Sequence, residues 1–448
     1  MNCLQNTDPE ISKLIDKEAE RQANTLMMIP SENMVSEAVE EVVGSCLSNK
    51  YAEGYPGKRY YQGQEFIDQI EIIAIERAKK AFGVPHANVQ ALSGSPANLA
   101  VYKALINPGD KLMGLALDHG GHLTHGSKVS ATGQYYKSVS YTLNKDEKMD
   151  YGLIRELALK EKPQIIVAGI TAYPLQVDWS EFAKIADEVG AYLLADVSHI
   201  SGLIVADEYP SPSDYVDVIT STTHKTLRGA RGALIMVTEK GMKKDEDMGK
   251  KIDKAVFPGL QGGPHMNSIA GIAVALKEAE TSGFKYYAKQ IVTNAGVLAE
   301  TLKSRGLRLV SGGTETHMML VDLRNKDITG NLGAEALEKA GIVLNRNGIP
   351  FDPNPPFYPS GIRLGTPGLT SREMKEEQMK LIGNFIADIV DDISKIKKQE
   401  SVGFDQEKKK AVREELILKS KEILRIKKEV LALTKRFPVK KCIVDLGE

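Results

Sequence analysis

Short apolar runs alternate with helical periods through the middle of the chain. Four such runs are QIIVAGI (164–170), AYLLAD (191–196), YVDVIT (215–220) and GALIMV (232–237). Between them lie stretches such as SEFAKIADEVG (180–190), whose apolar residues recur at the spacing of an amphipathic helix. Strands that alternate with helices are typical of βαβ units, in which parallel strands are buried on both faces. We therefore expect an α/β fold with a mostly parallel central sheet.

The same patterning divides the chain into three parts. Residues 1–48 begin with a charged amphipathic helix and predict an N-terminal helical arm. Residues 49–282 predict the large α/β domain, and the Gly/Pro-rich stretch PGLQGGPH (258–265) predicts a long irregular loop near its end. Residues 283–448 mix helical periods with strand-like segments such as HMMLVDLR (317–324). We expect them to form a smaller α+β domain with an extended helical tail.

Composition and charge narrow the class of protein. The chain has 448 residues, of which 42% are hydrophobic, and this is enough to bury a large core. Its 58 basic and 59 acidic residues leave a net charge of -1, so the chain has no overall positive electrostatic field that would attract nucleic acid or an anionic membrane. No secretory leader and no apolar run of membrane-spanning length is seen. The three cysteines show no metal-ligand spacing, which favours a reducing compartment, and we expect a cytoplasmic protein.

Candidate chemistry begins at Asp196, which closes the run AYLLAD. Ligands of an open parallel sheet bind at the carboxyl ends of its strands, and the next run brings His224 and Lys225 to the same edge. A helix cap at Asp196, or an ion pair between Asp196 and Lys225, would explain these residues structurally. The chemical alternative is pyridoxal phosphate, with Lys225 bonded to it as a Schiff base and Asp196 keeping its ring nitrogen protonated.

A phosphate anchor is expected upstream, in ALSGSPANLAVYKALI (91–106). Ser93, Gly94 and Ser95 form a turn there, and Pro96 is expected at the first position of an apolar-periodic helix. The free N–H groups of such a helix start bind phosphate well. The motif alone is also typical of an ordinary helix start, but Asp196 and Lys225 follow it in the order that a cofactor site needs.

Three histidines lie within LALDHGGHLTHGS (115–127) and raise the question of a metal site. No carboxylate or cysteine accompanies them at the usual ligand spacing in sequence. The Gly-Gly pair instead predicts a tight loop that brings one imidazole over a planar ring. We expect His122 to be that imidazole, and we expect no metal.

Taken together, these motifs resemble the serine hydroxymethyltransferase family, and the resemblance extends nearly to the C-terminus. It implies a pyridoxal-phosphate-dependent transferase fold of type I that interconverts serine and glycine, with tetrahydrofolate as cosubstrate. The motifs occur in one order along the chain: IPSENMVSEAV (29–39), YAEGYPGKRYY (51–61), HGGHLTHG (119–126), the segment around Asp196, THKTLRG (223–229), PGLQGGP (258–264) and SGIRLGTP (360–367).

The resemblance implies a role for each matching residue. Lys225 would carry the cofactor, Asp196 would bond the ring nitrogen, and His122 would stack on the ring. Glu53 would be the general acid-base group. The other residues implied in catalysis are Tyr61 and His224. The residues implied around the cofactor are Gly94, Ser95, His122, Thr171, Asp196, His199 and Lys225, with Tyr51, Gly262 and Gly263 reaching the site of a partner subunit.

Substrate recognition is implied by a second set of matches. Arg363 would bind the amino-acid carboxylate, because its planar guanidinium suits two-pronged recognition of carboxylates. Ser31 would assist it, and Tyr61 would act beside them from the partner subunit. The matches to folate-contacting positions are Leu117, Gly121, Leu123, Asn347 and Phe357. The active site would then be complete only in a homodimer with shared sites, and the sequence leaves a tetramer open.

Some residues depart from the family pattern next to the site. YYQGQE (60–65) stands where the family usually reads YYGG, Pro96 replaces a usual glutamine, and Pro30 lies beside Ser31. These changes leave alternatives open: a hydroxymethyltransferase for a non-glycine, for example α-branched, amino acid, or a folate-independent β-hydroxy amino acid aldolase. Since the matches to the folate positions are kept, we expect serine and tetrahydrofolate to be the substrates.

Overall fold

The computed structural model describes residues 3–439 and divides them into two compact units. We call them the large unit and the small unit. The chain changes unit after residues 34 and 292, whereas the divisions predicted after residues 48 and 282 remain predictions. The large unit comprises residues 35–292 and 314–317, and the small unit comprises residues 3–34, 293–313 and 318–439.

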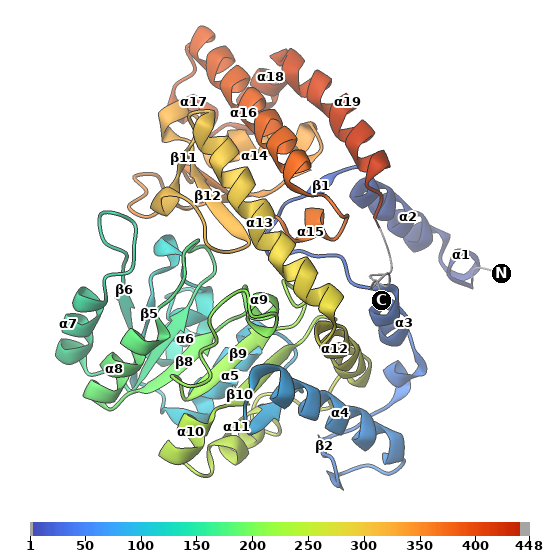
Figure 1. The fold of residues 1–448 in the computed structure, drawn as a ribbon, viewed down its shortest axis with the longest axis vertical. Helices are drawn as coiled ribbons and strands as arrows, with labels where there is room; N and C mark the ends of the chain where they lie inside the picture. The colour runs from blue at the N-terminus through green and yellow to red at the C-terminus, as the bar shows by residue number, and fades with distance from the viewer. Residues whose placement is uncertain (1–2, 440–448) are drawn as a thin grey trace. The chain divides into compact units, whose positions relative to one another are not determined.

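A seven-stranded sheet forms the centre of the large unit (Figure 1), in the order β4-β10-β9-β8-β7-β5-β6. In this sheet β10 pairs antiparallel with β4 and β9, and the remaining pairs are parallel. The predicted, mostly parallel sheet is therefore confirmed. Its strands are β4 (His86–Asn88), β5 (Lys111–Leu115), β6 (Lys137–Tyr141), β7 (Ile165–Gly169), β8 (Tyr192–Asp196), β9 (Val218–Thr222) and β10 (Ala233–Val237).

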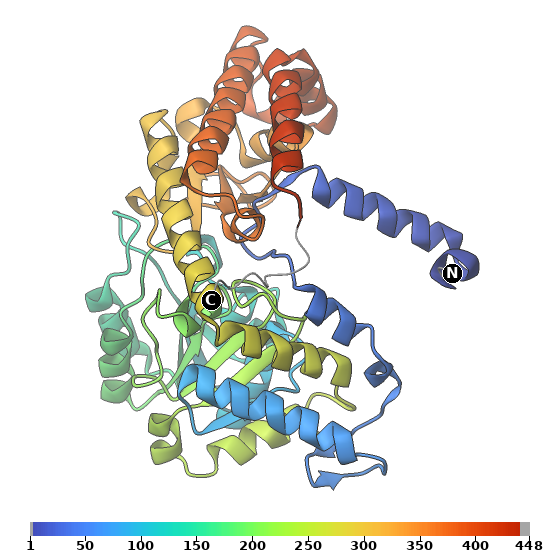
Figure 2. The ribbon, with the colours of Figure 1, turned by 45° about the vertical axis from the view of Figure 1, so that its right-hand side comes forward.

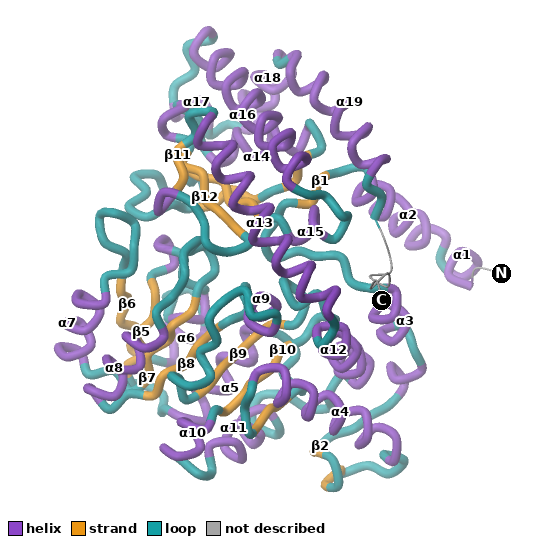
Figure 3. Tube along the Cα trace, in the orientation of Figure 1, coloured by secondary structure: helices purple, strands orange, loops and turns teal. Residues whose placement is uncertain are grey.

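Both faces of this sheet are buried. Successive residues of a strand point to opposite faces, so the burial of both faces can be followed along a single strand. In β7, Ile165 and Val167 join one apolar cluster and Ile166 and Ala168 join another. Figure 3 shows the strands among the helices of this unit. The first cluster includes α5 (Gly94–Leu105) and α11 (Met248–Val256), and the second includes α4 (Glu65–Phe82), α7 (Tyr151–Glu161), α8 (Trp179–Val189) and α12 (Met266–Ala279).

Two details of this unit position the candidate site. The loop predicted at 258–265 is observed between α11 and α12. Helix α5 begins at Gly94 with Ser93 as its N-cap, so Pro96 occupies the third helical position and not the first as we predicted. The helix can begin earlier because the first N–H groups of a helix have no partner within it, and a proline there removes no intrahelical hydrogen bond.

The small unit contains a four-stranded antiparallel sheet in the order β11-β12-β15-β14. Helices α16 and α19 pack side by side (Figures 1 and 2) and share an apolar cluster with the sheet. The polar segment predicted as a linker at 395–410 holds the end of α16 and the short helix α17. The strands are β11 (Arg308–Leu309), β12 (Met318–Asp322), β14 (Asn345–Asn347) and β15 (Gly361–Gly365), and the helices include α14 (Gly330–Lys339), α16 (Glu376–Gln399), α17 (Phe404–Glu407), α18 (Lys410–Lys419) and α19 (Lys421–Arg436).

The N-terminal segment belongs to the small unit by its contacts. The predicted amphipathic helix is α2 (Pro9–Ala23), and β1 (Leu26–Met27) after it pairs in parallel with β13 (Ile342–Val343). Helix α13 (Ser282–Ser304) runs from the large unit into the small one. Among residues 3–439, no helix has both the length and the apolar character needed to cross a bilayer. Cys442 lies outside the described residues.

Candidate active site

Asp196 ends strand β8 as a buried carboxylate held by three donors. The Asn98 amide donates to its Oδ2 over 2.8 Å, the His125 Nε2 approaches the same oxygen at 3.0 Å, and the Ser198 N–H donates to Oδ1 over 3.1 Å. Burial alone would raise the pKa of Asp196, but the hydrogen bonds and the neighbouring His122 and His125 hold it well below its usual range. Asp196 is therefore an anion throughout the neutral pH range.

His125 is a site residue that the sequence did not identify. Its Nδ1 accepts a hydrogen bond from the His122 backbone N–H over 3.1 Å, so its Nε2 carries the proton that is donated to Asp196. Gly169 makes room for this contact, since a Cβ on it would lie 2.7 Å from the His125 Cε1. The spacing His122–His125 was visible in sequence, but the carboxylate that pairs with His125 lies 71 positions away.

His122 lies next to this pair as a neutral ring. Its Nδ1 accepts the Thr124 N–H over 3.2 Å and lies 2.8 Å from the Thr124 hydroxyl. Burial lowers the pKa of His122 to about 4, an effect that the charge of Lys225 reinforces and that of Asp196 opposes. A neutral imidazole at this position suits stacking on a planar ring, which remains a prediction.

The ligand atoms of His122, His125 and Asp196 lie within 4.8 Å of one another, close enough to hold a metal ion. Our sequence argument against a metal relied on the absence of a carboxylate near the histidines, and the fold supplies one from β8. The argument was therefore incomplete, although the Asp196 carboxylate already accepts hydrogen bonds from His125 and Asn98.

The turn before His122 is shaped by two glycines. Gly120 has φ +102°, in the left-handed region, and its carbonyl accepts the Thr171 N–H over 2.8 Å. A Cβ on Gly121 would lie 1.9 Å from the Leu115 carbonyl oxygen, so no other residue fits there without displacing β5. Leu117 and Leu123 flank this turn with exposed side chains, as predicted folate contacts need to be.

The start of α5 provides the candidate phosphate anchor. Ser93 makes no side-chain capping hydrogen bond, so the first N–H groups of the helix do not donate to the side chain of its N-cap. Gly94 lies against β9, where a Cβ would come 2.8 Å from the Thr222 Cγ2. The free helix start and the close packing of Gly94 fit the predicted phosphate role of Gly94 and Ser95.

Lys225 and His224 follow the end of β9 in a bend. Both are partly buried, and the His224 Nδ1 is buried without a hydrogen-bond partner among the described residues. Burial lowers the pKa of His224 to about 4, with a further contribution from Lys225. Nearby, the His199 and His317 rings stack with centroids 5.5 Å apart. Lys225 therefore lies beside a neutral imidazole, just beyond the end of the strand that neighbours the Asp196 strand.

The residues predicted to serve a partner subunit cluster together. The Tyr51 hydroxyl donates to the Glu53 Oε1 over 3.1 Å, and the Tyr51 and Tyr61 rings meet edge to face at 4.9 Å. This hydrogen bond and the Glu53 charge raise the pKa of Tyr51. Gly262 and Gly263 pack on the pair, since a Cβ on Gly263 would lie 3.0 Å from the Tyr51 ring.

Four predicted substrate residues lie in the small unit. Arg363 is buried in the middle of β15, donates from Nε to the Asn345 side-chain oxygen over 3.2 Å, and burial lowers its pKa to about 10. Asn347 lies on the neighbouring strand β14. Phe357 is exposed and Ser31 is partly buried. Arg363 thus keeps its charge at neutral pH, as binding of a carboxylate requires.

Comparison with known proteins gives one consistent result. A family model described as serine hydroxymethyltransferase matches residues 4–386. A serine hydroxymethyltransferase of Desulfotalea psychrophila is 56% identical over 390 residues, which cover 87% of this chain and 90% of the relative. An enzyme of the same name from Acidothermus cellulolyticus is 52% identical, over 97% of this chain and 96% of the relative. Another from Campylobacter jejuni is also 52% identical, over 89% of this chain and 95% of the relative.

Proposed function

The chain belongs to the serine hydroxymethyltransferase family, and we propose that the surroundings of Asp196, His122 and Lys225 are its pyridoxal phosphate site. The protein is a pyridoxal-phosphate-dependent enzyme that interconverts serine and glycine, with tetrahydrofolate as cosubstrate. The observation that carries the site assignment is the buried, anionic Asp196, which is held by donors at the carboxyl edge of the sheet. The specialised transferase and the aldolase that the sequence left open are not favoured by these relatives.

The residues present fit the cofactor. Asp196 is an ionised acceptor in a buried site, which suits a protonated pyridine nitrogen. His122 is a neutral ring, Lys225 acts electrostatically on it, and the start of α5 leaves N–H groups for a phosphate. When bound, pyridoxal phosphate supplies an electron sink for the bond that breaks at the amino-acid Cα.

Each of these residues has a separate task in the proposal. Asp196 holds a proton at the ring nitrogen, and His125 fixes the orientation of the carboxylate through its Nε2–H. His122 would orient the ring, and Lys225 would hold the cofactor through its side-chain amine. Arg363 binds the substrate carboxylate, and Glu53 moves a proton at the substrate hydroxyl.

Substrate choice can be tested directly. Serine, allo-threonine and α-methylserine are assayed with and without tetrahydrofolate. We expect serine turnover to rise with folate by roughly 100-fold or more, because a positioned second substrate lowers the barrier to carbon transfer. Slow serine cleavage that is indifferent to folate, beside rapid folate-dependent turnover of another amino acid, would contradict the assignment.

We further propose that the enzyme is a homodimer with shared active sites. The segment that carries Tyr51, Glu53 and Tyr61 leaves large side chains exposed, with Tyr60 72% and Phe66 69% accessible. Exposed aromatic side chains beside a candidate site mark an interaction surface. A second copy of the chain is the partner that the family resemblance favours.

Mixed dimers test the shared site. Lys225→Ala and Tyr61→Phe chains are each expected to be nearly inactive, whereas their co-expression should restore roughly a quarter of wild-type activity, since half of randomly paired dimers hold one intact site. Co-expression of Lys225→Ala with Asp196→Asn is the control and should restore nothing, because both changes fall on the same side of the site. Heterodimers that form without recovering activity would rule out sharing.

The protein is also proposed to be cytoplasmic. Cys3 and Cys46 are free and exposed thiols. A reducing compartment preserves such thiols, so the cytoplasm suits this surface.

A further inference from the structure

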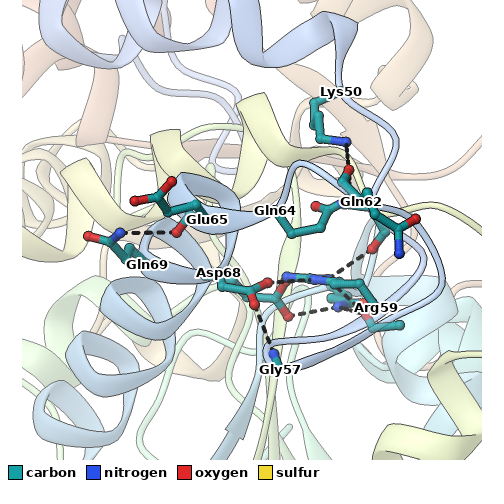
Figure 4. Close-up of polar contacts among 12 residues, drawn as sticks. Lys50, Gly57, Arg59, Gln62, Gln64, Glu65, Asp68 and Gln69 are labelled. Atoms are coloured by element: carbon teal, nitrogen blue, oxygen red, sulfur yellow. Dashed lines mark hydrogen bonds and ion pairs between the residues drawn. The ribbon is translucent and has the colours of Figure 1, made fainter.

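The loop formed by residues 51–62 contains a short hairpin of β2 (Gly54–Tyr55) and β3 (Lys58–Arg59), and a pair of side chains joins its two ends. The Lys50 Nζ donates to the Gln62 carbonyl over 2.9 Å and to the Tyr51 carbonyl over 3.3 Å. The Gln64 Nε2 donates to the same two carbonyls, over 3.0 Å to Tyr51 and 3.3 Å to Gln62. Figure 4 shows Lys50, Gln62 and Gln64 around this point. We call Lys50 and Gln64 the loop clamp.

The backbone on either side of Glu53 is fixed in the same way. The Arg59 Nη1 donates to the Ala52 and Gly54 carbonyls, each over 2.8 Å, and the Tyr60 N–H donates to the Glu53 carbonyl over 3.0 Å. Arg59 itself is held by ion pairs with Asp68 and Glu71, of which the first is drawn in Figure 4. Every carbonyl from Tyr51 to Gly54 therefore accepts a hydrogen bond.

Burial distinguishes Gln64 from the other glutamines of this region. Its side chain is directed to the two carbonyls and Gln64 is 9% exposed, whereas Gln62 and Gln69 are exposed. Gly63 between them has φ +72°, and a Cβ on it would lie 3.8 Å from the Lys50 Cε and Nζ. A larger residue at position 63 would strain the backbone, so the glycine lets the chain turn beneath the Lys50 side chain.

We propose that Gln64 and Lys50 are positioning residues for Glu53 and Tyr61. By joining the carbonyls of Tyr51 and Gln62, they close the loop that carries both groups and reduce the conformations open to it. Gln64, which lies in the departing stretch YYQGQE, thus acts on loop geometry. The inference rests on the proposed role of Glu53.

The expected loss of rate depends on how many donors each of the two carbonyls keeps. Each carbonyl has two lone pairs, and the two donors of the clamp fill both. Loss of one donor leaves the other in place, so each single replacement weakens the clamp without opening it. Loss of both leaves the loop ends unjoined, and misplacement of a proton-transfer group by even about 1 Å costs roughly 100-fold in rate.

The test compares Gln64→Met, Lys50→Met and the double variant with Gln69→Met as the matched control. Gln69 also donates its amide to a backbone carbonyl, that of Glu65 over 3.0 Å, but on the exposed side of α4 (Figure 4). We expect each single clamp variant to lose roughly 5- to 10-fold in kcat, with KM for serine nearly unchanged. The double variant should lose more than the product of the two single losses.

Hydrogen exchange supplies a readout that does not depend on turnover. The Tyr60 amide, bonded to the Glu53 carbonyl, should exchange faster in the clamp variants by roughly 10-fold, and at the wild-type rate in Gln69→Met. Should Gln64→Met fail to fold, Lys50→Met carries the test. Wild-type kcat and wild-type Tyr60 exchange in both clamp variants would overturn the inference. A wild-type enzyme that does not cleave serine would instead overturn the proposed function, while the exchange data still test the clamp.

Discussion

Replacing Lys225 by alanine is expected to abolish serine turnover, with a loss of roughly 1000-fold or more, since it removes the amine that we propose holds the cofactor. Lys225 follows the end of β9 and acts electrostatically on His122, which is predicted to lie over the cofactor ring. Borohydride reduction of the wild-type enzyme, followed by peptide mapping, should place the cofactor label on Lys225 alone.

A matched lysine sets the baseline for this experiment. Lys250 lies on α11 with an exposed side chain that pairs with Asp247. Lys250→Ala should retain wild-type activity and the wild-type label. A label on a lysine other than Lys225 in the cofactor-saturated enzyme, or full activity of Lys225→Ala, would refute the assignment.

The fold could be predicted from sequence largely because its strands are buried on both faces. Such strands must be apolar along their whole length, so the runs at 164–170, 191–196, 215–220 and 232–237 became β7, β8, β9 and β10. The edge that carries the candidate site followed from the same pattern, because parallel strands present their carboxyl ends on one side. Asp196 and Lys225 were accessible to this reasoning.

The hydrogen-bond network around Asp196 could not be predicted in this way. Two of its three donors, Asn98 on α5 and His125, lie 98 and 71 positions before the carboxylate, and a local sequence pattern does not reveal contacts at such separations. Gly169 was missed for the same reason, since its role is to make room for His125 and Asp196.

The loop clamp was also beyond sequence reasoning. Lys50 and Gln64 donate to backbone carbonyls, which every residue possesses, so their partners leave no signature in the sequence. The sequence shows that the stretch YYQGQE departs from the family pattern, but only the direction of the Gln64 amide indicates that Gln64 acts on the loop.

Asp196→Asn is expected to bind pyridoxal phosphate and yet to lose roughly 1000-fold in turnover, because a neutral amide does not hold a proton at the ring nitrogen. The amide also disturbs the network. Asn98 and His125 both donate to Oδ2 and Ser198 donates to Oδ1, so one donor would face the new NH₂ group. We therefore expect a further loss of about 1–3 kcal/mol in the free energy of unfolding.

The pH dependence of kcat and Tm gives a second test of the Asp196 carboxylate. The folded pKa of Asp196 lies below its unfolded value, so the stability that its ionised form contributes is complete above the unfolded pKa, near 4, and is lost as the pH falls through the folded pKa. The deficit of Asp196→Asn in kcat and in Tm should consequently be constant from about pH 6 to 9.

Asp178→Asn is the control. It keeps a good N-cap for α8 and should match the wild type in activity. If Asp196→Asn turns over serine at the wild-type rate while carrying a full complement of cofactor, the carboxylate has no part in holding the ring proton.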